Sequence, residues 1–334
     1  MFPVSRVEPR RERRRSRDPG PGTSQVTNPP TTAFCHEALF YEGGLAGFAD
    51  RLGPLIATTL DAGGSVVVAA PSDRLVRLAS EFGTTDRMEL IDMPAVGGNP
   101  ARIIPAWRDL ADRAHATGGP FLGIGEPIWA GRSAAELDEC HRHEALINVA
   151  FDADPAWRLI CPYDVDGLDP SVVDDARLTH PTVHESGSCT SRPIDGPSAF
   201  AALERPLSPV PADATTIRFG IDDLPDLRAL ARRVATSAGL TAERVDDLTL
   251  SIGEMACNAI RHGQPPRTLT IWSAPGVVTC EASNLGEVGD VLVGRRRPVP
   301  DQLSGRGVWI MHQLCDLVQI RSVNDQTVVR LTVS

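Results

Sequence analysis

The sequence predicts two domains of different fold class: an α/β domain built on a parallel sheet, followed by a two-layer α+β sandwich. Two observations lead to this prediction. In the first half, short apolar runs typical of buried strands alternate with helical stretches, as in parallel sheets covered on both faces. In the second half, alternating strands form hairpins, with helices before and between them, which favours an antiparallel sheet with helices on one face.

Length and composition set the outline of the chain. With 334 residues, the chain is long enough for about two domains. We expect the first to cover residues 34–185 and the second residues 213–334, with an extended linker over residues 186–212 that is rich in serine and proline. Residues 1–33 should form a disordered basic tail, because their arginines stand among proline, glycine, serine and threonine without an apolar period. Such a tail could contact acidic partners or nucleic acid, or remain solvated.

Charge and cysteine content argue against several classes of protein. The net charge of −10 is unsuited to a general nucleic-acid-binding surface, so we expect no direct nucleic-acid partner. No apolar run approaches the length of about 18 residues that suggests a transmembrane helix, and no signal peptide is visible, which predicts no membrane partner. Seven cysteines without a C-x-x-C pair suit reduced thiols, and the sequence therefore predicts a cytoplasmic protein.

The elements of the first domain follow from its apolar pattern. The run SVVVAAP lies between a Gly-Gly pair and a serine, and it is typical of a buried strand. Ser72 or Asp73 could cap the helix that follows it. Strands are predicted near residue 35 and over residues 65–71, 88–93, 120–127 and 157–164; helices are predicted over residues 44–62, 72–81, 103–117 and 134–150.

Polar residues gather near three of these predicted strands. Ligands of parallel α/β sheets bind beyond the carboxyl ends of the strands, so we expect the polar residues to converge at one end of the sheet. His36 could instead be a structural histidine, and Cys161 could be a buried thiol rather than a thiolate that binds haem iron. The candidates for a sensory site are His36, Tyr41, Glu126, Cys161, Tyr163 and Asp164.

Four short motifs of the first domain belong together. They are HEALFY, GEPIW, HEALINVAF and CPYD, and as a set they resemble the MEDS domain, a sensory module often fused to signalling ATPase domains. The resemblance covers residues 34–185. It implies that this domain senses a ligand or a state and does not catalyse a reaction. As a partner we expect an unknown small-molecule ligand.

The second domain begins with an alternating strand and a helix that ends at Gly239. Thr241 is expected to cap the next helix, which continues to His262. The later elements should be a hairpin around Pro275, an arginine-rich loop, a short helix and a closing hairpin. The predicted ranges are 215–221, 224–239, 242–262, 267–274, 277–283, 294–300, 305–314, 317–323 and 326–334.

The helix that ends at His262 carries two stripes at helical spacing. One stripe is apolar and reads as core: Leu248, Ile252, Met255 and Ala259. The other is polar: Asp247, Ser251, Glu254, Asn258 and His262. A carboxylate and a carboxamide one turn apart can supply oxygen ligands to Mg²⁺, which proteins usually share with substrate phosphates. A helix that is polar on one side by chance would give the same pattern.

Three motifs follow one another in the second domain. They are Glu254-x-x-x-Asn258, Asn284-Leu285-Gly286 and Ser304-Gly305-Arg306-Gly307. This order resembles the Bergerat-type (GHKL, HATPase_c) fold shared by histidine kinases, gyrase, Hsp90 and MutL. The segments GRRRP and SGRGVWIMHQLCDLV most resemble those of the anti-sigma-factor serine kinases of bacteria. The resemblance covers residues 213–334.

This resemblance assigns a role to each motif. It implies that Asn258 holds Mg²⁺ on the phosphates of ATP and that Glu254 is the general base for the attacking hydroxyl. His262 would lie near the phosphates. Gly286 would allow the chain to approach the adenine closely. The backbone N–H groups that receive phosphate oxygens would be those of Gly305, Arg306 and Gly307.

One position departs from the family pattern. The family has an aspartate two residues before the adenine-box glycine, where this chain has Asn284. An amide oxygen can accept the hydrogen bond of the adenine amino group, but without a charge. The loss should be about 1–2 kcal/mol, or about five- to thirtyfold in affinity.

Three functions are consistent with these motifs. The first is an anti-sigma factor and serine/threonine protein kinase that binds Mg²⁺ and ATP, with a sigma factor and an anti-sigma-factor antagonist as partners. The second is a catalytically inactive partner-switching module of the same fold. The third is a histidine kinase, although His180 and His184 stand in a segment unsuited to the long helices that carry a phosphoacceptor. The chain could form a homodimer.

Overall fold

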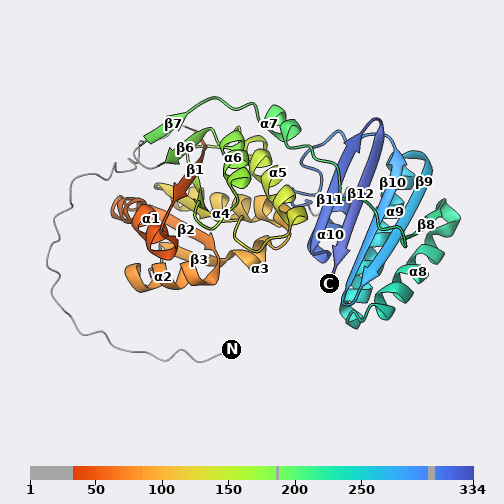
Figure 1. Cartoon of the computed structure of the whole chain (residues 1–334). Helices are drawn as coiled ribbons and strands as arrows, with labels where there is room; N and C mark the ends of the chain where they lie inside the picture. The colour runs from red at the N-terminus through yellow and green to blue at the C-terminus, as the bar shows by residue number, and fades with distance from the viewer. Residues whose placement is uncertain (1–32, 84, 186–187, 300–304) are drawn as a thin grey trace.

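The computed structural model describes residues 33–83, 85–185, 188–299 and 305–334 (Figure 1). Apart from residue 33, the expected basic tail lies outside the described residues, as does Ser304 of the third motif. None of the described helices is both long and apolar enough to cross a membrane.

The N-terminal domain is built on a mostly parallel seven-stranded sheet, which confirms the predicted α/β class. The strand order is β3-β2-β4-β5-β1-β6-β7, and only β6 and β7 pair antiparallel among these strands. The strands are β1 (Cys35–Tyr41), β2 (Ser65–Ala70), β3 (Met88–Asp92), β4 (Phe121–Gly125), β5 (Arg158–Asp164), β6 (Thr182–Glu185) and β7 (Ser188–Ser191).

Helices cover both faces of this sheet, because successive strand residues point to opposite sides. On β2, Val66 and Val68 pack beneath α1 and α2, whereas Val67 and Ala69 join a second core with Trp107 of α4. This second core also contains residues of α5 and α6. The helices are α1 (Gly44–Asp61), α2 (Ser72–Phe82), α3 (Met93–Gly97), the 3-10 turn η1 (Pro100–Arg102), α4 (Ile103–Thr117), α5 (Ala134–Ala150) and α6 (Pro170–Thr179).

The segment expected to be an extended linker contains two further elements. Strand β7 adds an antiparallel edge to the N-terminal sheet. Helix α7 (Gly196–Ala202) is capped by Asp195, and its Ala199 packs with Leu203 against Ala145 of α5. Apolar burial of this short helix overrides the turn-like composition of the segment. The extended part is therefore confined to the residues between α7 and β8.

The C-terminal domain is a five-stranded antiparallel sheet with helices on one face, as the sequence predicts. The strand order is β11-β12-β10-β9-β8. Its elements are β8 (Thr215–Arg218), the 3-10 turn η2 (Ile221–Asp223), α8 (Leu224–Ser237), α9 (Ala242–His262), β9 (Gln264–Ala274), β10 (Val277–Leu285), α10 (Gly307–Leu314), β11 (Leu317–Val323) and β12 (Gln326–Val333).

Helix α9 is the central helix of this domain. Thr241 caps it, since its hydroxyl accepts the N–H of Arg244. The apolar stripe predicted from the sequence is buried against the sheet, where Leu248 and Ile252 are fully covered. Packing of this stripe fixes the rotation of the helix about its axis. The neighbouring polar stripe consequently faces α10 and the end of the sheet.

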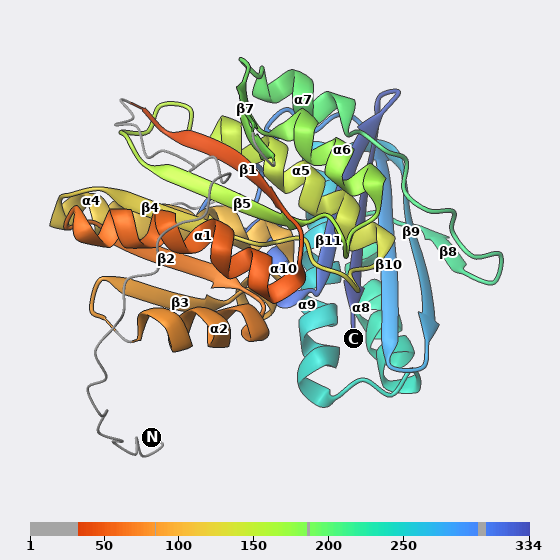
Figure 2. The same cartoon turned by 60° about the vertical axis from the view of Figure 1, so that its left-hand side comes forward.

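The two domains lie side by side, with β11 and α10 on the side of the C-terminal domain that faces the N-terminal domain (Figures 1 and 2). Arg321 of β11 donates to Glu139 of α5 at 2.6 Å. The loop before α10 reaches the same carboxylate through Arg295, at 3.1 Å. These ion pairs are buried, so the domains share a common interior as well as a connecting chain.

Limited proteolysis should identify the connection between the domains. Among the residues that the structure describes, we expect a protease of broad specificity, such as subtilisin, to cut first within residues 206–214, which are mostly exposed and have no helix or strand before β8. The two fragments should remain associated because of the buried ion pairs. Mass spectrometry locates the cut and gel filtration tests association. First cleavage inside β7 or α7 would contradict this arrangement.

Candidate functional site

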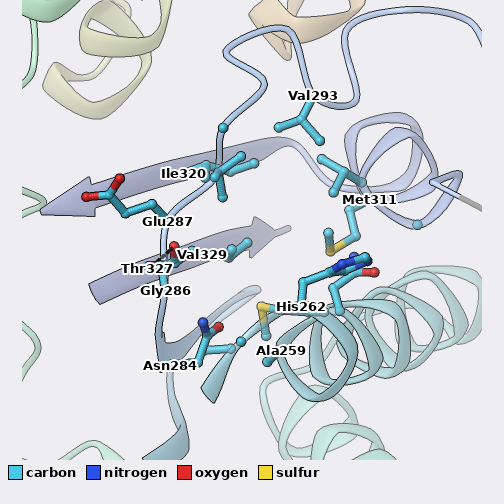
Figure 3. A pocket seen from close by; sticks show the side chains of 18 of the residues that line it. Ala259, His262, Asn284, Gly286, Glu287, Val293, Met311, Ile320, Thr327 and Val329 are labelled. Atoms are coloured by element: carbon cyan, nitrogen blue, oxygen red, sulfur yellow. Dashed lines mark hydrogen bonds between the residues drawn. The ribbon is translucent and has the colours of Figure 1, made fainter. Parts of the chain in front are cut away.

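A cavity of about 330 Å³ opens in the C-terminal domain between α9, α10 and the ends of β10 and β12 (Figure 3). Figure 3 shows Asn284, Gly286 and Thr327 on one side of it, with His262 and Met311 across from them. Most of its wall is apolar. The apolar side chains are Met255, Ala259, Ala282, Val288, Val293, Val308, Met311, Ile320 and Val329.

The structure brings residues from each of the three sequence motifs to this cavity. Glu254 lies beside the cavity, next to the first turn of α10: a methyl group built on Gly307 would stand 2.6 Å from its Oε2 atom and 3.0 Å from Asn258 Nδ2. Arg306 is exposed and its guanidinium donates to Val299 O. The motif residues that line the cavity are Asn258, His262, Asn284, Gly286, Gly305 and Gly307.

Asn258 carries an unusual polar group. Its Nδ2 atom is buried and has no hydrogen-bond partner among the described residues. An unpaired buried polar group costs about 1–3 kcal/mol, so such a group is normally explained by a bound partner. Its amide oxygen is also an acceptable ligand for Mg²⁺. The unpaired Nδ2 group suits a hydrogen-bond acceptor, whereas Oδ1 is the atom that could bind Mg²⁺, so the metal role of Asn258 stays a prediction.

The polar stripe of α9 has two parts with different roles. Near the start of the helix, Asp247 forms an ion pair with Arg244, and Ser251 accepts the thiol of Cys315 at 3.3 Å. Burial raises the pKa of Cys315 to about 12, which keeps this thiol protonated. These residues hold the C-terminal end of α10 against α9. Only the later part of the stripe, from Glu254 onward, is directed to the cavity.

Asn284 closes one end of the cavity. Its Nδ2 atom donates to Leu285 O at 2.9 Å, which leaves Oδ1 as the acceptor. The side chain packs directly on Gly263 at the end of α9. An aspartate here would place a carboxylate oxygen against the Leu285 carbonyl. The amide thus satisfies a backbone oxygen that the family's aspartate could not.

Thr327 is a site residue that the sequence analysis missed. It stands directly opposite Asn284 in the β10–β12 ladder and lines the cavity. Its hydroxyl donates to Gly286 O at 2.6 Å, while Gly286 N–H donates to Asp325 O at 2.7 Å. Gly286 has φ +117°, a conformation that favours glycine. Strand alternation places Thr327 and Val329 on one face, but only the pairing with β10 places that face at the site.

The six candidates of the N-terminal domain do not converge as expected. Tyr41, Glu126 and Asp164 lie together with Arg74 of α2: Tyr41 Oη donates to Glu126 Oε1 at 3.2 Å, and Arg74 Nε donates to it at 2.9 Å. Arg74 Nη2 is 3.6 Å from Asp164 Oδ2. Burial raises the pKa of Glu126 to about 8, against the opposing effect of the arginine. The sequence analysis missed Arg74 because it searched the ends of predicted strands, and Arg74 lies in the first turn of α2, just after β2 ends.

The other three candidates lie across the sheet, on the side of α5 and α6. His36 and Cys161 are buried with Nε2 and Sγ 3.4 Å apart. Tyr163 packs edge-on against His180, at 5.6 Å between ring centroids. Burial lowers the pKa of His36 and raises that of Cys161 well above its usual range. His36 and Tyr41 are five residues apart on one strand, so the period of two places them on opposite faces.

The N-terminal domain also forms hydrogen bonds to α10, the helix that borders the cavity. Arg102 donates to three carbonyl groups at the C-terminal end of α10, those of residues 312, 313 and 315, at 2.7–2.9 Å. Asn99 donates to two of the same carbonyls at 3.2 Å. The last carbonyls of a helix have no partner within it, and here another domain supplies the donors.

The fit between Gly263 and Asn284 can be tested by stability. A methyl group at Gly263 would stand 2.1 Å from Asn284 Nδ2 and 2.8 Å from its Cβ, so Gly263→Ala must displace Asn284. We expect a loss of about 1–3 kcal/mol in the free energy of unfolding, as for other overpacked sites. Chemical denaturation followed by circular dichroism measures it.

Gly289→Ala is the matched control for this substitution. Its methyl group would meet no atom within 4 Å, and its φ lies outside the range from +20° to +160° that strains a side chain. It should change the stability by less than about 0.5 kcal/mol, as surface substitutions usually do. Equal effects of the two substitutions would show that Asn284 does not rest on Gly263.

Comparisons with solved structures give only distant likenesses. The crystal structure of the RsbU and RsbW domains of Rv1364c from Mycobacterium tuberculosis matches with 18% identity and a TM-score of 0.27, covering 36% of this chain and 32% of that one. The cytoplasmic domain of EssC matches with 12% identity and a TM-score of 0.28, covering 44% of this chain and 29% of that one. The chain thus spans less than a third of either structure.

Family models match both domains. The model of MEDS, described as the methanogen/methylotroph, DcmR sensory domain, matches residues 35–181. The model described as the histidine kinase-like ATPase domain matches residues 219–333, which include the whole cavity. No curated protein matches the sequence significantly. The chain therefore joins a MEDS sensory domain to a domain of the histidine kinase-like ATPase family.

Proposed function

We propose that the C-terminal domain binds Mg²⁺ and ATP, and that the chain is an anti-sigma factor with serine/threonine kinase activity under the control of its sensory domain. One observation carries this proposal. The buried Nδ2 atom of Asn258 has no hydrogen-bond partner among the described residues, and it stands beside Glu254 and the start of α10 in a cavity whose walls are mostly apolar. The polar end suits phosphates and the apolar walls suit a nucleobase.

Each residue of the cavity has a part in this proposal. Asn284 Oδ1 would accept the adenine amino group, while Asn258 would hold Mg²⁺, the ion that neutralises charge on the phosphates. The N–H groups at the start of α10 would receive phosphate oxygens, as free helix N-termini do. Glu254 would take the proton of the attacking serine or threonine hydroxyl.

The proposed partners follow from the same family resemblance. They are a sigma factor, which the chain would sequester, and an anti-sigma-factor antagonist, which would be the phosphorylated substrate. No direct contact with nucleic acid is needed for such a role. The histidine kinase alternative is disfavoured, because His180 is fully buried and the His184 ring lies 2.6 Å from Glu37. Neither ring is available to receive a phosphoryl group.

A second candidate function is a nucleotide-free partner-switching module of the same fold. The observation that favours it is Asn284, a neutral residue whose amide is engaged with the backbone. Asparagine in place of the family's aspartate would weaken the binding of adenine without altering the outer surface of the domain. Partner binding could then persist without phosphotransfer.

Substitutions on α9 separate these two functions. We expect calorimetry on the full chain to show Mg²⁺-dependent binding of a non-hydrolysable ATP analogue. Asn258→Ala should weaken it by at least tenfold, because the metal loses a protein ligand. Glu254→Ala should keep binding within about threefold but abolish ADP formation from ATP, because a general base acts in the transition state.

Glu243→Ala is the matched control for these variants. This carboxylate is in the first turn of α9, about 20 Å along the helix from Asn258 at a rise of about 1.5 Å per residue. It should leave both binding and ADP formation unchanged. If the native chain binds no analogue at millimolar concentration, the kinase proposal is wrong and the partner-switching module becomes the better account.

Control by the sensory domain is proposed to act through α10. Arg102→Ala removes three hydrogen bonds to the last carbonyls of this helix, so its amide hydrogens should exchange about tenfold faster or more. Arg108→Ala serves as control, because Arg108 pairs with Asp154 within the N-terminal domain. Hydrogen exchange with mass spectrometry compares the variants. Equal exchange of α10 in both would show that the sensory domain does not hold this helix.

A further inference from the structure

Four side chains meet inside the N-terminal domain, on the α5 and α6 side of the sheet. They come from four elements: His36 from β1, Cys161 from β5, Glu144 from α5 and His180 from the end of α6. Their ligand atoms all lie within 4.8 Å of one another. Each residue is at most 2% exposed, so the group is closed to solvent.

The contacts within this group are short. His36 Nε2 is 2.9 Å from Glu144 Oε2, and Cys161 Sγ is 3.4 Å from each of these atoms. His180 Nε2 is 3.2 Å from the same carboxylate oxygen. Four atoms that can bind a metal thus surround one point.

Outer hydrogen bonds turn both imidazole rings toward that point. Asn148 donates its Nδ2 to Thr179 O at 2.7 Å, so its Oδ1 must accept the Nδ1–H of His36, at 3.1 Å. His180 Nδ1 is 2.8 Å from Ala176 O, which can only accept. Both rings therefore carry their hydrogen on Nδ1 and present the Nε2 lone pair to the centre. Hydrogen bonds of this kind orient histidines that bind metals.

The group lacks hydrogen-bond donors. Two Nε2 lone pairs and a carboxylate face one another, and the thiol of Cys161 offers a single weak hydrogen. Among the described residues, neither His180 Nε2 nor Glu144 Oε1 has a hydrogen-bond partner. Buried acceptors that face one another are costly unless a cation lies between them.

A divalent ion balances the charge of this group. The carboxylate of Glu144 and a thiolate of Cys161 carry two negative charges, and two neutral imidazoles add none. Binding would release one proton, from the sulfur of Cys161, as the metal–sulfur bond forms. The loaded site is neutral, which avoids the cost of a net charge in the core.

We propose that His36, Glu144, Cys161 and His180 form a tetrahedral site for a divalent transition-metal ion of the zinc class. Zinc lies about 2.0–2.2 Å from nitrogen and oxygen ligands and about 2.3 Å from sulfur, which places neighbouring ligands about 3.3–3.6 Å apart. The distances of 2.9–3.4 Å match this after a small outward movement. Thiolate and imidazole ligands disfavour Mg²⁺ and Ca²⁺.

The ligand count indicates what the ion does. Four protein ligands leave no open position, so the ion would not activate water or substrate and would tie the four elements together. Helix α5 supplies Glu144 to this site and Glu139 to the arginines of the C-terminal domain. An ion at this site therefore fixes the helix that joins the two domains. This inference is independent of nucleotide binding.

Metal titration of the full chain tests the site. After chelation and dialysis, the native chain should bind one Zn²⁺ with release of one proton and a rise in melting temperature. Co²⁺ should give the visible bands of a tetrahedral ion and a thiolate charge-transfer band. Cys161→Ala and Glu144→Gln should lose these signals, and Asn148→Ala should weaken affinity about 10–100-fold, as loss of an orienting hydrogen bond does.

Cys140→Ala is the matched control. Cys140 is a buried cysteine of α5 whose thiol donates to Pro127 O, outside the group of four. This variant should keep the thiolate–Co²⁺ band and the stoichiometry. X-ray absorption on the zinc-loaded native chain should report one sulfur and three nitrogen or oxygen ligands, a result that does not depend on any variant folding.

Two results would overturn the proposal. One is a native chain that binds no Zn²⁺ or Co²⁺ at micromolar concentration. The other is binding that Cys161→Ala retains, or a ligand shell without sulfur, which would indicate an adventitious surface site.

Discussion

A buried carboxylate, Glu139, determines how the two halves of this protein are joined. It is 2% exposed and accepts hydrogen bonds from Arg295 and Arg321, which belong to different segments of the other domain. Burial lowers the pKa of Arg295 to about 10, which reflects the cost of placing this cation in the interior. Breaking such a pair typically costs about 3–5 kcal/mol, because a buried charge is left alone. Charge pairing at particular atoms therefore helps to fix the arrangement of the domains, together with the hydrogen bonds from Asn99 and Arg102 to α10.

The cavity is built from segments that are distant in sequence. Antiparallel pairing places Thr327 opposite Asn284, and the packing of α9 directs Glu254 and Asn258 toward α10. The Cys315–Ser251 contact holds one end of α10, and the glycine at position 307 allows the other end to approach α9 closely. Sheet register and helix packing together form this cavity. Its walls are mostly apolar, and polar side chains stand at its ends.

Sequence patterns predicted the fold class, because strand and helix periods are local properties. The motif order selected residues that the structure places in the wall of one cavity, Asn258 and Gly286 among them, while their roles in nucleotide binding stay predictions. Thr327 could not be found in this way, since its role depends on strand pairing. The same holds for Glu144, which lies in a quoted motif but meets His36 only through the packing of α5 on the sheet. The prediction that the N-terminal candidates converge was avoidable. Side chains alternate along β1, so His36 and Tyr41 must lie on opposite faces of the sheet.

The C-terminal carbonyls of α10 have a consequence for how this domain can be studied. Their donors, Asn99 and Arg102, are encoded more than two hundred residues earlier, in the other domain. In a fragment that contains only the ATPase-like domain, the last carbonyl groups of α10 would therefore lose the donors that Asn99 and Arg102 supply. Water would have to donate to these carbonyl groups instead. The helix would then be less stable, including its first turn beside the cavity. Studies of this pocket should therefore use both domains together, although the family match begins only at residue 219.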